Sequence, residues 1–365
     1  MKIEISRKVL ADALSELAPL AGKKQALTIL SNVKCVVKGN RMRMQASAGT
    51  MTIRKYVELI NSETDGEFIT DCVSLNNFVG KVKDDFLTLT YADNVLNVKH
   101  SKGNAKFPAQ PTDDFPEVKI DAEATEFNIP ANKFIRLLTT AKGFVSTETL
   151  RPMMCVVRAK IENGILNMSA SDTQQLFTDS ASVESGDLNI EWNVEQYAFP
   201  FLIKAGKKEE AIIVRISAKN AQYRCGDTTV FTQLTQGNFP NIARVIPQTH
   251  NIEATCDKAE ILDSLSRVMM FTEQSKVIRV NTTPMTMDIS VDNLDTMRSA
   301  KESIRCTSDD EIVFGVNVAY FINCLNACES RDVTIQLSDP TRPVVIKDKE
   351  NPERTILCMP MQLNN

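Results

Sequence analysis

"KIEISRKVLADALSEL", residues 2–17, joins two kinds of periodicity and decides the fold of this chain. Its first five residues alternate polar and apolar side chains, as a half-buried strand does. The remainder repeats apolar residues every three or four positions, as an amphipathic helix does. The same order returns in "EFNIPANKFIRLLTTA" (126–141) and in "IEATCDKAEILDSLSRVM" (252–269). Three copies of one strand–helix unit indicate an internally repeated protein.

A second set of three segments repeats the strand–helix order: "GEFITDCVSLNNFVGKVKD" (66–84), "LNIEWNVEQYAFPFLIKAGK" (188–207) and "DEIVFGVNVAYFINCLNAC" (310–328). Each is followed by a segment with period-two alternation and a hairpin-like turn: "FLTLTYADNVLNVKH" (86–100), "AIIVRISAKNAQYRCG" (211–226) and "DVTIQLSDPTRPVVIKD" (332–348). Leu87, Ile212 and Val333 hold equivalent places, 125 and 121 residues apart, in a chain of 365 residues. The repeat is therefore about a third of the chain.

The repeats also end alike. "DDFPEV" (113–118) closes the first and "GNFPNI" (237–242) the second, while "CMPMQL" (358–363) closes the third. A chain terminus is normally polar and frayed, so the apolar one here needs an explanation. We predict that it is the last strand of a repeat.

Each repeat is expected to contain two helices packed on one face of an antiparallel sheet, which is an α+β architecture. The polar stretches at 118–126 and 246–253 predict three domains, with bounds 1–120, 121–248 and 249–365. Tandem repeats of this kind often form an extended concave surface.

Composition excludes several classes of protein. A net charge of −4 and a pI near 5.5 argue against nucleic-acid binding over the whole surface, although a local basic lining is compatible with them. Nine scattered cysteines without a CxxC pair, and only two histidines, indicate reduced, buried thiols instead of a zinc site. The absence of a membrane-length apolar stretch, and a start unlike a signal peptide, predict a cytoplasmic protein.

No motif recommends an enzyme. The sequence has no GxxxxGK[ST] or GxGxxG loop, and its paired aspartates, such as Asp84–Asp85, lie at predicted turns where solvated caps are expected. Neither His100 nor His250 sits in a nucleophile motif. We therefore expect a non-catalytic protein without cofactor or metal.

The repeat length, the two Phe-Pro motifs and the terminal "MPMQL" resemble the bacterial sliding clamp, the β subunit of DNA polymerase III. Three further segments match that family: "ETLRP" (148–152), "NFPNIARVIP" (238–247) and "VFGVNVAYFINCLNA" (313–327). The resemblance covers the whole sequence. It implies a homodimeric, six-domain ring whose helices line a hole for duplex DNA, which is held without reading its sequence.

Basic residues lie on or just after the candidate helices, and one lies in the "AGKKQALTIL" loop. By the resemblance, the DNA-facing set is Lys24, Lys81, Lys83, Lys133, Arg136, Lys142, Lys204, Lys207 and Arg267. The alternative is that these side chains are simply solvated, as most surface lysines are. The sixth candidate helix carries no basic residue.

The family holds polymerases, clamp loaders and repair proteins through a hydrophobic pocket between domains two and three, which takes a peptide of the type Gln-x-x-Leu-Phe. The matching residues are Met154, Ser171, Thr173, Leu176, Pro240, Arg244, Val245, Asn317, Tyr320, Leu357, Met359, Pro360 and Met361. Methionines suit a pocket that serves several partners. For Met359 and Met361 the alternative is ordinary core packing.

This sequence departs from the family at the pocket. Where the family usually reads Thr-Asp-Gly-His-Arg-Leu, residues 171–176 read "SDTQQL", and a usual arginine is Gln362. The sequence "MCV" (154–156) replaces the usual Leu-Asn-Gly. We expect a pocket with less positive charge and less backbone freedom, and with an altered peptide preference.

Ring closure is expected to use Phe107 on one side and Met270 and Phe271 on the other, unless these residues belong to the core. A different hypothesis is a protein-binding scaffold that uses the same repeat and is never loaded on DNA.

Overall fold

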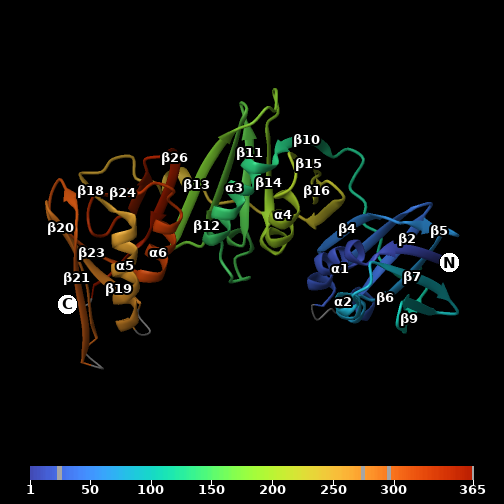
Figure 1. Ribbon diagram of the computed structural model, residues 1–365. Helices are drawn as coiled ribbons and strands as arrows, with labels where there is room; N and C mark the ends of the chain where they lie inside the picture. The colour runs from blue at the N-terminus through green and yellow to red at the C-terminus, as the bar shows by residue number, and fades with distance from the viewer. Residues whose placement is uncertain (23–26, 273–275, 294–296, 364–365) are drawn as a thin grey trace. The chain divides into compact units, whose positions relative to one another are not determined.

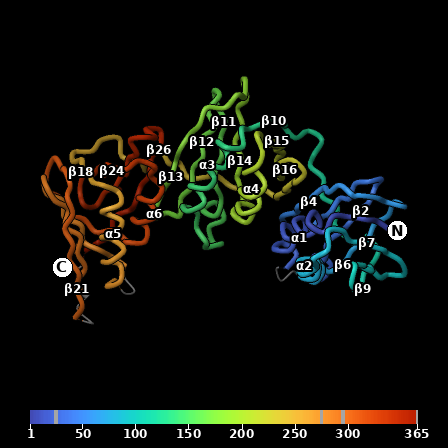
Figure 2. Tube along the Cα trace, viewed as in Figure 1, coloured from blue at the N-terminus to red at the C-terminus, as the bar shows by residue number. Residues whose placement is uncertain are grey.

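The computed structural model describes residues 1–22, 27–272, 276–293 and 297–363 (Figures 1 and 2). The protein forms two compact units. One contains Met1–Ile135 and Tyr197–Leu234, and the other Arg136–Gln196 and Thr235–Asn365. The middle third of the sequence is therefore divided between the two units.

Six α-helices occur in the described residues: α1 (Arg7–Ala21), α2 (Cys72–Lys81), α3 (Ala131–Ala141), α4 (Phe199–Gly206), α5 (Lys258–Val268) and α6 (Val318–Asn326). Short 3-10 helices are η1 (Thr28–Ser31), η2 (Lys142–Phe144), η3 (Pro152–Met154), η4 (Gln196–Ala198), η5 (Ile242–Arg244) and η6 (Met269–Phe271). All six predicted strand–helix segments are confirmed, since each helix follows its strand directly or after one short turn.

The first unit contains one sheet in the order β10-β15-β16-β17-β4-β3-β2-β6-β9-β8-β7-β1-β5. Its strands are β1 (Lys2–Ser6), β2 (Asn32–Lys38), β3 (Arg41–Ser47), β4 (Met51–Glu58), β5 (Asn61–Ser62), β6 (Gly66–Asp71), β7 (Phe86–Ala92), β8 (Val95–His100), β9 (Gly103–Gln110), β10 (Thr125–Pro130), β15 (Ala211–Ile216), β16 (Asn220–Cys225) and β17 (Thr228–Gln233). The β4–β17 ladder joins the first third of the sequence to part of the middle third.

The second unit contains two sheets, ordered β14-β11-β12-β13-β26-β25-β24-β18-β22 and β21-β20-β19-β23-β27. Their strands are β11 (Val156–Glu162), β12 (Ile165–Ser171), β13 (Gln175–Ser182), β14 (Ile190–Glu195), β18 (Ile252–Asp257), β19 (Val277–Thr282), β20 (Thr286–Asn293), β21 (Arg298–Arg305), β22 (Thr307–Ser308), β23 (Ile312–Asn317), β24 (Asp332–Leu337), β25 (Val344–Asp348), β26 (Asn351–Cys358) and β27 (Pro360–Met361). The apolar C-terminus is thus strand, as predicted.

The internal repeat is visible in the strand register. Leu87 pairs with Ile5, Ile212 with Ile129, and Val333 with Cys256. In each case the second residue of the later strand lies opposite the next-to-last residue of the strand that precedes a helix. Every pairing in the described sheets is antiparallel, so the α+β prediction is confirmed. The domain bounds 1–120, 121–248 and 249–365 remain a prediction.

Local sequence explains where the helices begin and which face they bury. Asp257 accepts hydrogen bonds from the Ala259 and Glu260 amides at the start of α5, and Asp71 accepts one at the start of α2. In α1, the fully buried residues Leu10, Leu14 and Leu17 follow helical spacing and pack toward β3 and β4. Helix α1 lies beside α2, and α5 beside α6 (Figure 1).

The "DDFPEV" motif pins the polar linker to the first sheet. Phe115 is buried, and the Pro116 carbonyl accepts a hydrogen bond from Gln45 Nε2 at 3.1 Å. The Glu117 carboxylate pairs with three cations, Lys34 at 2.9 Å, Arg43 at 3.3 Å and Arg54 at 3.3 Å. One carboxylate shared by three cations explains why the motif is acidic after its proline.

Candidate functional site

Strands β13 and β26 bring together residues that are distant in the sequence. Leu176 lies opposite Leu357, and Gln175 opposite Cys358. The ladder extends one residue further, because the Met359 amide donates to the Gln174 carbonyl at 2.8 Å. Leu176 and Leu357 are both buried, so their side chains support the site from below and contribute little to its exposed surface.

The C-terminal segment continues from this ladder onto a second sheet. Pro360 and Met361 of β27 pair with Val316 and Gly315 of β23. A Cβ at Gly315 would lie 2.5 Å from the Met361 carbonyl oxygen, so only glycine permits this approach. A cavity of about 400 Å³ borders the segment, lined by Val313, Phe314, Gly315, Pro340, Thr341, Pro360, Met361, Gln362 and Leu363.

The start of α6 contributes Asn317 and Tyr320. The Asn317 side chain caps the helix by accepting from the Ala319 amide at 3.0 Å and the Tyr320 amide at 3.4 Å. The Tyr320 side chain is half-buried, and its burial, together with the negative charge of Asp172, raises the pKa of its phenol. Tyr320 therefore lies close enough to the 171–176 turn to sense its charge.

The turn "SDTQQ" has the backbone conformation of a glycine turn without the glycine. Thr173 has φ +79°, which is strained for a β-branched residue. Asp172 Oδ1 holds the turn by accepting from the Gln174 amide at 2.8 Å and the Gln175 amide at 2.7 Å. Ser171 Oγ adds a hydrogen bond from the Thr173 amide at 3.1 Å. The expectation that the pocket has less backbone freedom than in the family stays a prediction.

Gln175 fixes the turn to α6. Its side chain is buried, donates to Asp172 at 2.9 Å, and accepts from Asn323 Nδ2 at 2.8 Å. Asn323 also donates to the Gly143 carbonyl at 2.9 Å. A neutral amide thus stands here, where the resemblance leads one to expect an arginine.

The remaining predicted pocket residues lie on other segments. Met154 is buried in η3, whereas Pro240, Arg244 and Val245 are exposed around η5. The segment that leads to Pro240 packs near η3, because a Cβ at Gly237 would lie 3.1 Å from Met153 Cγ. Strand pairing and hydrogen bonds bring nine of the predicted pocket residues together: Ser171, Thr173, Leu176, Asn317, Tyr320, Leu357, Met359, Pro360 and Met361.

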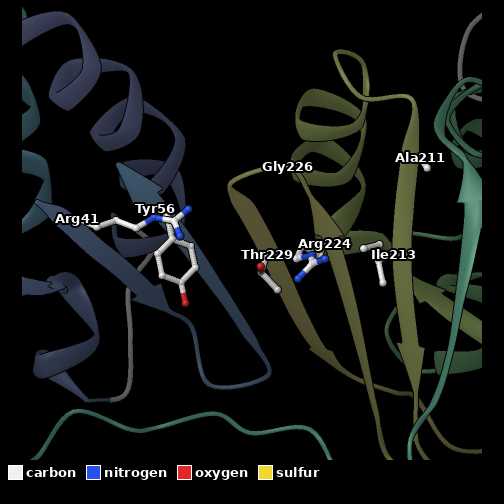
Figure 3. Close-up of a pocket in the computed structure, with 7 residues that line it drawn as sticks. All are labelled: Arg41, Tyr56, Ala211, Ile213, Arg224, Gly226 and Thr229. Carbon is white, nitrogen blue, oxygen red and sulfur yellow. The ribbon is translucent and has the colours of Figure 1, made fainter. Parts of the chain in front are cut away.

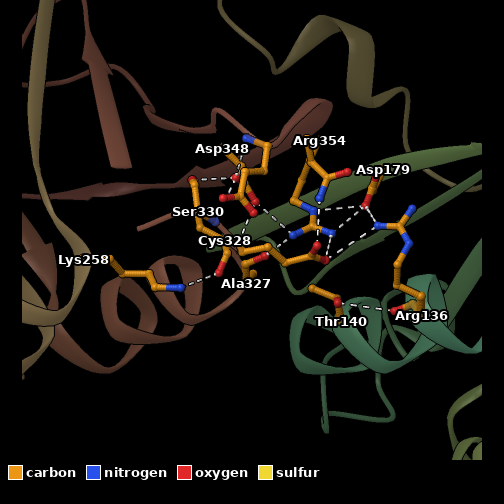
Figure 4. A network of polar contacts seen from close by, with 12 residues as sticks. Arg136, Thr140, Asp179, Lys258, Ala327, Cys328, Ser330, Asp348 and Arg354 are labelled. Atoms are coloured by element: carbon orange, nitrogen blue, oxygen red, sulfur yellow. Dashed lines mark hydrogen bonds and ion pairs between the residues drawn. The ribbon is translucent and has the colours of Figure 1, made fainter. Parts of the chain in front are cut away.

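A buried ionic network braces the β13–β26 joint (Figure 4). Arg354, which is fully buried, donates to Asp179 at 3.0 Å, Asp348 at 3.1 Å and Glu329 at 2.6 Å. It also donates to the Ala327 carbonyl at 2.6 Å. Asp179 lies on β13 and Arg354 on β26, so the network ties the middle third of the sequence to the last third.

Sequence reasoning missed Arg354. The available signal was one arginine at the edge of an otherwise apolar run, "RTILCMPM", in a strand expected to be buried. Such a cation needs buried carboxylates, because a charge in the interior is costly unless it is paired and hydrogen-bonded. The network also contains Arg136, which donates to Asp179 at 2.9 Å.

The predicted basic set divides into exposed and paired residues. Lys81, Lys83, Lys142, Lys204 and Lys207 are exposed and have no ion pair within the described residues, and Lys133 is half-buried in α3. Arg136 instead pairs with Asp179, and Arg267 with Glu302. Lys24 lies outside the described residues. The two arginines have their charges compensated, which the sequence alone did not indicate.

The residues expected at the ring interface are not core residues. The exposed fraction of Met270 is 74%, and Phe271 beside it in η6 is half-buried. Phe107 is half-buried on β9, with its ring 5.6 Å from that of Phe78 in an edge contact.

All nine cysteines are buried, as the sequence indicated, and the structure has no disulfide among them. Burial raises the pKa of the Cys72 thiol to about 12 and that of Cys225 to about 12, so neither is a reactive thiolate near neutral pH. No group of three His, Cys, Asp or Glu side chains in the described residues could hold a metal ion. Within the same residues, no helix has the length and apolar character required to span a membrane.

Comparisons with known proteins give one result. A family model described as the N-terminal domain of the DNA polymerase III beta subunit matches residues 1–119, and one for its C-terminal domain matches residues 243–362. A "Beta sliding clamp" from Rickettsia felis is 22% identical over 381 residues, covering 100% of both proteins. Another from Helicobacter pylori is 23% identical, covering 95% of this protein and 94% of that one.

Solved structures share the fold over the full length. The DNA polymerase III subunit beta from Pseudomonas aeruginosa has a TM-score of 0.94 at 20% identity, with 100% of both proteins covered. The beta subunit from Thermotoga maritima has a TM-score of 0.92 at 17% identity, with the same coverage. A P. aeruginosa sliding clamp bound to griselimycin has a TM-score of 0.95 at 21% identity, again covering 100% of each protein.

Proposed function

The chain belongs to the family of DNA polymerase III beta subunits, the sliding clamps, and on that premise we propose that it encircles duplex DNA as a non-catalytic processivity factor. The observation that carries the proposal is the threefold strand register, with Ile5–Leu87, Ile129–Ile212 and Cys256–Val333 pairing alike. A unit built three times in one polypeptide, and six times in a dimer, suits a closed ring. The domains proposed are 1–120, 121–248 and 249–365.

The ring would close through two strand edges. In β9, only Ala109 and Gln110 pair with β6, which leaves the earlier residues with β8 as their sole partner in the described sheet. Strand β21 is the edge of its own sheet. Exposed strand edges seek partners, so β9 of one copy and β21 of another are proposed to pair. Phe107 lies on the first edge, and α5 and η6, which carries Met270 and Phe271, pack against β21.

The DNA-facing surface is proposed to use the lysines Lys81, Lys83, Lys142, Lys204 and Lys207, which have no ion pair within the described residues, together with Lys24 and Lys133. These charges can attract phosphate without fixing a register, which permits sliding. Arg136 and Arg267 contribute less to this field, because each is held by a carboxylate.

The partner site is proposed to be the surface around the C-terminal segment, α6 and the 171–176 turn. Its occupant would be a short peptide of a polymerase, clamp loader or repair protein, entering beside Tyr320, Met359 and Met361 with Pro240, Arg244 and Val245 at the rim. The griselimycin complex of the P. aeruginosa clamp is consistent with a ligand site on this fold. DNA as the partner also implies the cytoplasm.

Encirclement separates this function from a scaffold that never surrounds DNA. The dimer is loaded on nicked circular DNA and washed in high salt, which screens surface charge contacts. We expect the protein to stay bound to the circle and to be released once the DNA is cut to a linear form. Equal release from circular and linear DNA would exclude a ring and leave the protein-binding scaffold.

A further inference from the structure

A cavity of about 440 Å³ lies in the first unit and shares no lining residue with either proposed surface. It is lined by Arg41, Tyr56, Ala211, Ile213, Arg224, Gly226 and Thr229 (Figure 3). This volume is within the range of small-ligand clefts, about 300–1,000 Å³. Its lining combines two guanidinium groups, two hydroxyl groups and the apolar side chains of Ala211 and Ile213.

The strand register places these side chains on the sheet face opposite α1. Ile213 pairs with Arg224, Arg224 with Thr229, and Thr229 with Arg54, two residues before Tyr56. Directly paired residues, and residues two apart, share a face. The intervening Lys55 points to the other face, where it forms an ion pair with Glu16 of α1 at 2.7 Å. The cavity therefore opens on the side of the sheet that α1 leaves uncovered.

The two arginines of the cavity differ in the ion pairs and hydrogen bonds that they make with the rest of the protein. Arg41 pairs with Asp227 at 3.0 Å and Glu58 at 3.3 Å, and its guanidinium lies over the Tyr56 ring at 4.7 Å. Arg224 is exposed and has neither an ion pair nor a hydrogen bond from its side chain within the described part of the protein. Figure 3 shows Arg224 across the cavity from the Arg41–Tyr56 pair. Arg224 is thus a cation with its full donor set available.

The charge around the cavity selects the ligand. Asp227 and Glu58 already compensate Arg41, and the Glu209 carboxylate lies against Gly226, where an added Cβ would meet Oε1 at 2.6 Å. These three carboxylates repel any anion, but they repel a doubly charged phosphate more strongly than a singly charged carboxylate, which the one uncompensated charge of Arg224 can balance. The planar guanidinium of arginine also matches a carboxylate with two parallel hydrogen bonds.

We propose that this cavity binds a carboxylate-bearing peptide group, which Arg224 holds with the Tyr56 and Thr229 hydroxyls beside it and Ile213 under its apolar part. The carboxylate can come from an acidic side chain or from the C-terminus of a peptide. Its lining residues are none of those proposed for the DNA and partner surfaces.

Saturation-transfer NMR on the full-length protein tests the site with four small probes. N-acetyl-leucine carries a terminal carboxylate, the α-amide of N-acetyl-glutamate carries a side-chain carboxylate, N-acetyl-leucinamide is the neutral match, and AMP supplies a phosphate. We expect saturable binding of at least one carboxylate probe and none of the neutral amide. Binding of only one carboxylate probe identifies the source of the group.

Variants localise the signal. Arg224→Gln is expected to lower the affinity for the carboxylate probe roughly tenfold, because a charge-assisted hydrogen-bonded pair is lost. Lys219→Gln, an exposed cation in the β15–β16 turn outside the cavity lining, should leave the affinity unchanged. The proposal is overturned if no carboxylate probe binds better than the amide, if AMP binds and the carboxylates do not, or if Arg224→Gln binds like the unchanged protein.

Discussion

The Arg354 guanidinium and the Asp179 carboxylate lie 3.0 Å apart, and the exposed fraction of each side chain is 1%. They come from β26 and β13, whose pairing positions Leu357 opposite Leu176. Because this ion pair is buried from solvent, it favours one arrangement of the two strands. The proposed partner site is built on this arrangement.

Replacing Arg354 with methionine should destabilise the protein by about 3–5 kcal/mol, because Asp348 would remain buried without its cation and Asp179 would keep only Arg136. Urea unfolding followed by circular dichroism measures this loss. The matched control is Arg331→Gln, since Arg331 pairs with Asp257 with 88% of its side chain exposed and should contribute less than about 1 kcal/mol. Similar losses in the two variants would contradict a special role for the buried network.

Acid should weaken the same network. The hydrogen bond from Arg354 holds the pKa of Glu329 below its ordinary value. A carboxyl with a lower pKa in the folded than in the unfolded protein stabilises the fold above its unfolded pKa, and this contribution disappears as the pH falls through the folded pKa. We therefore expect the free energy of unfolding to fall from about pH 5 downward. In Glu329→Gln the fall should be shallower, and an identical pH dependence would be evidence against the assignment.

Thr173→Gly should stabilise the protein, because φ +79° costs a β-branched residue more than it costs glycine. The gain is expected to be roughly 0.5–1 kcal/mol, after the greater backbone entropy of glycine in the unfolded state is subtracted. Thermal unfolding measures it. Asn163→Gly is the control, since Asn163 has φ +51° and asparagine tolerates this region. A less stable Thr173→Gly protein would show that the threonine side chain makes a compensating contact.

The proposed partner site should discriminate against acidic peptides. Burial raises the pKa of Tyr320, and the negative charges of Asp172 and Glu148 raise it further. No basic residue occurs in "SDTQQL". A Gln-x-x-Leu-Phe peptide with neutral spacer residues should bind about fivefold tighter than one with two acidic spacers, with the difference reduced in high salt. Fluorescence polarisation measures both peptides.

Two variants show whether this preference arises at the site. Glu148→Gln should reduce the difference in affinity between the neutral and the acidic peptide. Glu184→Gln should not, because Glu184 lies beyond the opposite end of β13. Equal affinities for both peptides would refute the charge preference but not the site, while failure of both to bind would refute the site itself.

Met270→Asp should separate the proposed dimer, because it would place a charge on η6 beside the proposed β9–β21 contact. Light scattering at micromolar concentration is expected to shift from about twice 40.6 kDa to 40.6 kDa. Met285→Asp, with an exposed fraction of 79% in a different turn, is the control and should keep the larger mass. A Met270→Asp protein of unchanged mass would move the interface elsewhere.

Much of the fold could be predicted from local periodicity. The segment 2–17 indicated its strand and helix correctly, and the equivalence of Leu87, Ile212 and Val333 reappears as one shared register. Charge pairing was less predictable, because it depends on which distant strands meet. Arg136 and Lys81 look alike in sequence, but only Arg136 reaches a buried carboxylate. For the same reason Arg354 could not be recognised without the β13–β26 ladder.

The β4–β17 ladder, reinforced by the Arg41–Asp227 ion pair, makes the connecting segment dispensable for cohesion. The polar stretch after Val118 connects the first third of the sequence to β15–β17 covalently. The main-chain hydrogen bonds between β4 and β17 hold the same two parts together without it. A protein nicked by a protease between Lys119 and Glu123 would keep its two fragments together as one particle until those hydrogen bonds were melted.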